Sequence, residues 1–146
     1  MNAEPGSHER HDLSSLARAC EVLGDRWSLP IVAALLDGPL RYTELQEGLP
    51  AIAPNILTAR LRKLEEEGLV VPSRYTARPP RFDYRLTPDG AALADAIRLL
   101  SSWADRRAGG AEAPVHGACG SDLEVRWWCP TCDLPAEPAE DGPILA

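Results

Sequence analysis

The chain has 146 residues, which suffices for one compact domain with a small appendage, and 45% of them are hydrophobic. The formal net charge of −7, taken alone, argues against nucleic acid as a partner. No apolar run reaches the roughly 18 residues of a membrane-spanning helix, and the polar N-terminus does not resemble a secretory signal, so a cytoplasmic protein is expected.

The negative charge is unevenly distributed. Residues 109–146 contain seven acidic residues and one basic residue, whereas residues 55–85 contain seven basic and four acidic residues. Exposed charges more than about 10 Å apart are largely screened at moderate salt, so the basic segment can still bind phosphate. An ordinary solvated surface is the alternative for such a window taken alone.

Three helices are predicted in the first third of the chain. The first covers about 13–23, the second covers 28–36 with Ser28 as its cap, and a short third covers about 43–49 with Thr43 as its cap. Gly or Pro closely follows each segment. The apolar face of the first helix is expected to consist of Leu13, Leu16, Cys20 and Leu23.

The segment after Pro54 carries the clearest helical pattern. Leu57, Leu61 and Leu64 recur at helical spacing and form one face that is expected to pack on a core. Gly68 is predicted to end this helix as a C-terminal cap.

Two strands and a long helix follow. Residues 69–71 predict a buried strand, and the alternation of apolar and polar residues over 82–86 predicts a half-exposed one, so the two form a hairpin. Thr87 is the expected cap of the last helix, which has Pro88 in its first position and ends near Arg107. Its apolar face is expected to consist of Leu93, Ile97, Leu100 and Trp103.

This order of elements predicts a winged helix-turn-helix: a mainly α fold with a β-hairpin wing, in which residues 49–54 are the turn. A zinc-ribbon-like element is expected after it. The predicted organisation is a disordered N-terminus (1–12), the winged helix-turn-helix domain (13–108), a linker (109–115), the zinc-ribbon-like element (116–135) and an acidic, Pro-rich tail (136–146).

The helix after Pro54 has the two opposed faces that a DNA recognition helix needs. Its polar face is basic near the start, and Glu65–Glu67 lie at the far end, away from a DNA backbone. Asn pairs with adenine and Arg with guanine through two hydrogen bonds, while a small residue permits close approach. The candidate DNA-binding residues on this helix are Asn55, Thr58, Ala59, Arg62 and Lys63.

The basic residues also have a structural interpretation, because Arg60, Arg62 and Lys63 can pair with Glu residues three or four positions further on. The neighbouring hairpin favours DNA binding, since arginines on or beside its tip would reach phosphates or the minor groove. These further candidates are Arg74, Arg78 and Arg81, together with Arg41 before the short helix.

Five motifs together resemble the HxlR-type winged-helix transcription regulators over residues 13–103: LGDRW, LLDGP, RYTEL, ILTARLRKLEEEGLV and PPRFDYRLTP. The resemblance implies a homodimer whose first and last helices pack across the two-fold axis. It also implies binding of double-stranded DNA at an inverted repeat near a promoter, without catalysis. It leaves open a small-molecule effector of unknown identity.

Many members of that family carry a redox-sensing cysteine at the start of the first helix, where this chain has Ser14. Cys20 lies on the apolar stripe instead, so a small buried hydrophobic residue is the preferred interpretation of it. A thiol switch at the usual place is therefore in doubt.

Three cysteines and a histidine near the C-terminus form the pattern H-x2-C, nine residues, C-x2-C. Thiolates and imidazole suit a structural, tetrahedral Zn²⁺ site. The expected ligands are His116, Cys119, Cys129 and Cys132, with Asp122 or water as the alternative to His116, and residues Leu123, Val125, Trp127 and Trp128 are expected to form a connecting hairpin.

Other interpretations of the cysteines are free thiols in an unfolded tail and a redox-active Cys129–Cys132 pair. For the whole chain, the alternatives to a DNA-binding regulator are a winged-helix module for protein–protein contacts and a thiol–disulfide enzyme. The enzyme is disfavoured because the sequence lacks a βαβ context, a Ser/His/Asp triad and paired catalytic carboxylates.

Overall fold

The computed structural model describes residues 13–77, 80–110, 115–121, 123 and 126–136, with only the backbone described at 75–77 and 80–81. The chain divides into two compact units, residues 22–123 and residues 1–21 with 124–146. The unit over 22–123 contains the wing and all described helices after the first, and the other unit contains most of the first helix and a small hairpin.

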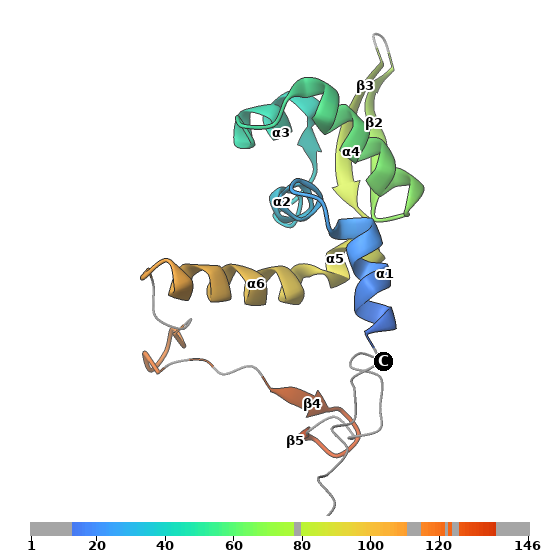
Figure 1. Ribbon diagram of the computed structural model, residues 1–146. Helices are drawn as coiled ribbons and strands as arrows, with labels where there is room; N and C mark the ends of the chain where they lie inside the picture. The colour runs from blue at the N-terminus through green and yellow to red at the C-terminus, as the bar shows by residue number, and fades with distance from the viewer. Residues whose placement is uncertain (1–12, 78–79, 111–114, 122, 124–125, 137–146) are drawn as a thin grey trace, which may run out of the picture. The chain divides into compact units, whose positions relative to one another are not determined.

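Within the described residues, the helices and strands follow the predicted order (Figure 1). The helices are α1 (Ser14–Leu23), α2 (Ser28–Ala34), α3 (Tyr42–Gly48), α4 (Pro54–Glu66), α5 (Pro88–Ala92) and α6 (Ala94–Arg107). The strands are β1 (Leu40–Arg41), β2 (Val70–Ala77), β3 (Pro80–Leu86), β4 (Trp127–Cys129) and β5 (Leu134–Ala136). None of the described helices is long and apolar enough to cross a membrane.

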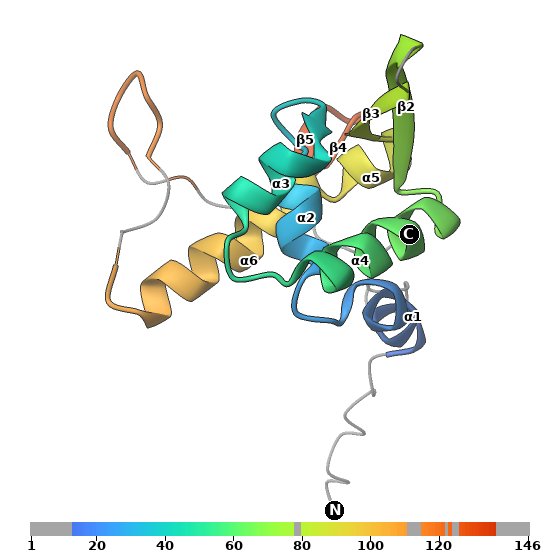
Figure 2. The same ribbon diagram turned by 90° about the horizontal axis from the view of Figure 1, so that it is seen from above.

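The core of the larger unit gathers around α2, which lies among α3, α4 and α6 (Figure 2). The leucine face predicted for α4 is confirmed, because Leu57, Leu61 and Leu64 are all buried. Burying three leucines of one helix contributes several kcal/mol, about 1.5–3 for each side chain. The buried partners of this face include Ile31, Val32, Leu35, Leu45, Ile52, Leu69 and Val70.

The wing is a three-stranded antiparallel sheet in the order β1-β3-β2. Strands β2 and β3 form the predicted hairpin, with a register shift between Arg74 and Thr76. The two-residue strand β1 pairs with β3 through Leu40 and Tyr84 and was not predicted, because two residues carry no alternation of apolar and polar positions.

Two of the predicted helix caps are confirmed. Gly68 ends α4 at φ +71°, and the bonds from Leu69 N–H to the Leu64 carbonyl and from Gly68 N–H to the Glu65 carbonyl satisfy the last turn. Thr87 caps α5, and its side chain accepts a hydrogen bond from the Gly90 amide at 3.0 Å.

Two other caps were predicted wrongly. Ser28 lies inside α2, and the carboxylate of Asp25 accepts hydrogen bonds from the amides of Trp27 and Ser28 instead. Helix α3 begins at Tyr42 rather than at Thr43, and the Glu44 carboxylate accepts from an amide that precedes the helix. In both cases a carboxylate outside the usual cap position accepts hydrogen bonds from backbone amides at the start of the helix.

The long last helix was predicted as one element, but it divides at Leu93 into α5 and α6. Helix α5 lies very close to the end of α4, because a Cβ atom at the buried Gly90 would lie 2.1 Å from the Leu69 carbonyl oxygen. The Thr87 hydroxyl also donates to the Gly68 carbonyl at 2.7 Å. Together these contacts join the two ends of the wing to α5.

Candidate nucleic-acid interface

Helix α4 exposes the face that the sequence assigned to DNA. Asn55, Thr58, Ala59 and Arg62 are exposed, and Lys63 is half-buried, whereas the leucines of the opposite face are buried. The helix begins with Pro54 at its first position after an extended Ala53 that makes no side-chain cap. Its opening turns therefore present polar side chains on one surface.

Tyr42 holds the start of α4 against α3. Its hydroxyl donates to the Pro54 carbonyl at 2.8 Å and lies 3.3 Å from the Thr58 hydroxyl, which itself lies 3.0 Å from the same carbonyl. Thr58 thus has a positioning bond within its own helix as well as an exposed surface. Sequence reasoning missed Tyr42, although its position at the start of the short helix was visible.

Gln46 fixes the turn between α3 and α4. Its side-chain amide donates to the Ile52 carbonyl at 2.8 Å, and Ile52 itself is buried. The turn is therefore held by one hydrogen bond and one apolar anchor, so the angle between the two helices is set before any ligand binds.

Arg60 does not belong to the DNA-facing surface. Its guanidinium lies 3.4 Å from the carboxylate of Asp25, and the two side chains are only 32% and 20% exposed. The alternative interpretation, in which Arg60 pairs with a Glu of its own helix, is therefore not what the structure shows for Arg60. Arg60 instead connects α4 to the segment before α2.

Asp25, in the LGDRW motif, is an electrostatic anchor of this connection. Burial acts to raise the pKa of its carboxyl, but the Ser28 hydroxyl at 2.5 Å, the two amides and the Arg60 charge outweigh burial and lower the pKa below 3.8. The carboxylate is therefore ionised at neutral pH.

The far end of α4 is acidic, as expected. Burial raises the pKa of the Glu65 carboxyl, with Arg62 opposing the shift and Glu66 adding to it. Burial also raises the pKa of the Tyr84 hydroxyl on β3, and the charge of Glu65 reinforces that effect. The acidic end of α4 thus lies near Tyr84 of the sheet, at the opposite end of the helix from its opening turns.

The wing contributes further basic residues. Arg74 on β2 is exposed and pairs in register with Phe82, and the exposed Arg85 on β3 is a basic residue that the sequence analysis did not select. Arg78 lies outside the described residues, and of Arg81 only the backbone is described, within β3. Arg41 is exposed immediately before α3.

Apolar side chains are exposed on α1 and α6. On α6, Leu99, Leu100 and Trp103 are 43–54% exposed, and the exposed fractions of Leu16 on α1 and of Leu13 directly before it exceed half. The predicted apolar face of α6 is therefore buried only at Ile97. Cys20 is also exposed in the single chain, so its prediction as a buried residue is wrong.

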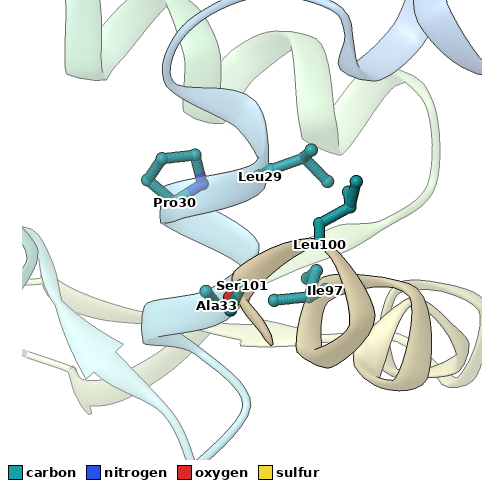
Figure 3. A pocket seen from close by; sticks show the side chains of 6 residues that line it. All are labelled: Leu29, Pro30, Ala33, Ile97, Leu100 and Ser101. Atoms are coloured by element: carbon teal, nitrogen blue, oxygen red, sulfur yellow. The ribbon is translucent and has the colours of Figure 1, made fainter. Parts of the chain in front are cut away.

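An open apolar hollow of about 160 Å³ lies between α2 and α6 and continues the exposed face of α6 (Figure 3). Leu29, Pro30 and Ala33 line it from α2, and Ile97, Leu100 and Ser101 line it from α6. A single chain thus leaves apolar side chains of α6 exposed beside an apolar hollow.

The candidate metal ligands lie in two local turns. His116 Nδ1 and Cys119 Sγ are 3.2 Å apart, and the Asp133 amide donates to the Cys129 carbonyl at 2.9 Å across the second turn. The described part of the chain holds no group of three or more His, Cys, Asp or Glu side chains arranged to hold a metal ion. Asp122, the alternative ligand, lies outside the described residues.

One thiol in each of these turns has a lowered pKa. The Ser121 hydroxyl and amide and the His116 ring lower the pKa of Cys119 to about 7. The backbone amides of Cys132 and Thr131 lower the pKa of Cys129. Amides that point at a sulfur stabilise its thiolate form.

The predicted hairpin between the two turns is not found as expected. Strands β4 and β5 instead enclose the second turn, pairing Trp127 with Ala136 and Cys129 with Leu134. Leu123 lies outside any strand, and Val125 is outside the described residues. The residues after Cys132 carried no alternation that the sequence analysis could recognise.

Three helices, of which α3 and α4 form a helix-turn-helix, followed by a basic wing define the class of winged-helix DNA-binding proteins. The model of the HxlR-like helix-turn-helix family matches residues 22–111. The chain belongs to this family. It is a DNA-binding transcription regulator, and the family is not one of enzymes.

Relatives and solved structures agree with this assignment. The chain is 35% identical over 127 residues to an HTH-type transcriptional regulator of Mycobacterium tuberculosis, Rv3095, covering 84% of this chain and 80% of the relative. It is 35% identical over 88 residues to YodB of Bacillus subtilis, covering 60% and 79%. The reduced form of YodB superposes with a TM-score of 0.57 at 33% identity, covering 64% of this chain and 91% of YodB.

Proposed function

We propose that α4 enters the major groove with its opening turns against the base pairs. The observation that carries the proposal is the division of α4 into a buried leucine face and an exposed polar face. Asn55 and Arg62 suit bidentate readout of adenine and guanine, and Ala59 lets the helix approach closely. Thr58 and Lys63 are assigned to phosphates or base edges.

The wing and the start of α3 supply backbone contacts in this proposal. Arg41 is exposed immediately before α3 and Arg74 is exposed on β2, and Arg78 and Arg81 belong to the same hairpin as Arg74 by sequence. Contacts of arginine with phosphate position a domain without reading sequence. Loss of one such residue weakens binding to all sequences alike.

We propose further that the regulator is a homodimer that assembles through α1 and α6. Both helices carry apolar side chains that a monomer would leave in water: Leu16 on α1 with Leu13 directly before it, and Leu99, Leu100 and Trp103 on α6. A two-fold axis that relates these helices of the two copies would present two α4 helices to DNA. The operator would then be an inverted repeat with half-sites one helical turn, about 34–36 Å, or a multiple of it apart.

The proposed place of action is the cytoplasm, where the protein would associate with the nucleoid when bound to DNA. The experiment that tests the function is selection of bound fragments from the genomic DNA of the source organism. The recovered sites are then titrated with the full chain at several salt concentrations. Because phosphate contacts release counterions, affinity is expected to fall steeply as salt rises.

Arg62→Ala is the informative variant for the same titration, and Arg98→Ala is the matched control. Arg98 lies on α6 and pairs with Asp95 at 2.8 Å. Its replacement by alanine therefore removes an exposed arginine that is not part of α4. Arg62→Ala is expected to weaken binding about 5- to 150-fold, which corresponds to roughly 1–3 kcal/mol, while Arg98→Ala leaves it unchanged. Indifference of binding to both salt and Arg62→Ala would contradict the proposal.

A further inference from the structure

The residues after the winged-helix domain contain two turns with the same backbone construction. Each begins with a candidate ligand, has a second ligand three residues later, and is followed by a residue with positive φ: Gly120 at +70° and Asp133 at +56°. In each, the amide of that following residue donates to the carbonyl of the first ligand. The two turns share ligand spacing but little other sequence.

The first turn brings an imidazole and a thiol together. The Gly120 amide donates to the His116 carbonyl at 2.7 Å, and the His116 amide donates to the Ser121 carbonyl at 2.8 Å. These bonds close an i→i+4 turn in which His116 Nδ1 and Cys119 Sγ lie 3.2 Å apart. A tetrahedral zinc ion, with bonds of about 2.0 Å to nitrogen and 2.3 Å to sulfur, would hold two such atoms about 3.5 Å apart.

The second turn repeats this construction for two thiols. The Asp133 amide donates to the Cys129 carbonyl at 2.9 Å, and strands β4 and β5 hold the ends of the turn through three residue pairs. Asp133 is the only residue other than glycine with positive φ among the described residues. This conformation is uncommon outside glycine, although Asp tolerates it better than most residues do.

We propose that these two turns bind one structural zinc ion in a closed, four-ligand site. The ligands are His116, Cys119, Cys129 and Cys132. Two ligand pairs with two residues between their members, one carrying nitrogen and sulfur and the other two sulfurs, are a donor set that favours Zn²⁺. Four protein ligands leave no open position, so the ion serves folding rather than catalysis.

The apolar residues around the turns explain why a metal is needed. Val115, Leu123, Trp127, Trp128 and Leu134 are all at least half exposed, and none of the core side chains among the described residues comes from 115–136. A segment this short cannot obtain its stability from apolar burial alone, so a metal or a disulfide must supply it. The His–Cys pair favours the metal, because a disulfide would use neither His116 nor the odd third cysteine.

Zinc binding is then coupled to ordering of the segment. The pairs are formed locally, but no three ligands are gathered among the described residues. The ion itself would bring the second pair to the first, so the free energy of binding becomes free energy of folding. Trp127 and Trp128 directly precede Cys129, which makes tryptophan emission a reporter of this step.

The test uses the full chain purified under reducing conditions in zinc-containing buffer and then desalted. Elemental analysis is expected to give about one zinc per chain. Cys132→Ser is expected to lose most of this zinc, and Cys20→Ser is the matched control that retains it. Cys20 lies on α1, outside both turns, so its loss should leave the zinc content unchanged.

Replacement of zinc by Co²⁺ gives a second readout that does not depend on yield. Tetrahedral coordination by thiolates is expected to produce intense d–d and sulfur-to-cobalt absorption in the full chain and in Cys20→Ser, but not in Cys132→Ser. Three alkylation-protected thiols in the zinc form, against four reactive thiols after chelation and unfolding, complete the expected result.

Three outcomes would overturn the proposal. One is a chain without stoichiometric zinc whose cysteines all react freely, which indicates an unstructured tail. Another is a disulfide between Cys129 and Cys132 that persists under mild reduction. The third is zinc that remains in Cys132→Ser. A folded winged-helix domain, shown by its unchanged circular dichroism, distinguishes these outcomes from general unfolding.

Discussion

The winged-helix core and the segment over 115–136 obtain their order in opposite ways. In the first, α4 alone buries three leucines completely or almost completely against α2, α3 and the wing. In the second, the described residues form short turns and a two-stranded hairpin, and their large apolar side chains are at least half exposed. The comparison shows that a domain held by burial needs no ligand to fold, whereas a segment held by turns has to gain stability from something else.

The largest expected effect concerns the apolar burial that stabilises the winged-helix core. Leu57→Ala removes a fully buried side chain and is expected to lower the free energy of unfolding by about 2–5 kcal/mol. Leu134→Ala, at a leucine that is 61% exposed, is the matched control and should change it by less than about 0.5 kcal/mol. Urea unfolding followed by circular dichroism measures both, and equal effects would refute the contrast.

Gly90→Ala tests the close approach of α5 to the end of α4. The added Cβ would lie 2.1 Å from the Leu69 carbonyl oxygen, so backbone must move and a loss of about 1–3 kcal/mol is expected. Gly48→Ala is the control, since a Cβ there meets nothing within 4 Å. Thermal unfolding of the two variants is compared, and a normal midpoint for Gly90→Ala would contradict the described packing.

Tyr42→Phe tests the hydrogen bond that connects α3 to the start of α4. It removes the hydrogen bond to the Pro54 carbonyl, and a loss of stability of about 0.5–1.5 kcal/mol is expected. Because the same hydroxyl positions the opening turn of α4, affinity for the selected DNA should fall as well, by several-fold. Unchanged affinity of Tyr42→Phe would remove this hydroxyl from the interface.

The pH dependence of stability tests Asp25. Its folded pKa lies below the unfolded value of 3.8, so its contribution is fully present above that value and is lost as the pH falls through the lower folded pKa. Asp25→Asn should therefore be less stable than the wild type at pH 7, by about 0.5–2 kcal/mol as for other helix caps. The difference should shrink below pH 3.8; a difference constant down to the acid transition would contradict the assignment.

Local signals predicted much of the larger unit. The leucine spacing of α4, the glycine at its end and the Thr-Pro pair before α5 act within a few residues, so the sequence carries them directly. Contacts across the chain were missed for the same reason. The bond from Tyr42 to Pro54, the ion pair of Arg60 with Asp25 and the pairing of β1 with β3 depend on how separate segments meet.

The sequence predicted those parts of the candidate site that depend only on residue type and on the face of a helix. The exposed positions of α4 follow from the buried leucines on the opposite side, whereas Arg60 could not be separated from Arg62 without knowing what lies beside it. In the C-terminal segment the ligand spacing was visible, but the hairpin was expected before the second turn rather than around it. Three-residue strands carry too little pattern to predict their partners.

The central claim is that the exposed face of α4 reads base pairs, and a base-substitution profile tests it most directly. Each position of a selected operator half-site is changed in turn, and binding is measured for the wild type, Arg62→Ala and Arg74→Ala. The account predicts that Arg62→Ala loses discrimination at one position, whereas Arg74→Ala weakens all sequences alike and reduces the salt slope by about 1. An unaltered profile for Arg62→Ala, and likewise for Asn55→Ala, would contradict it.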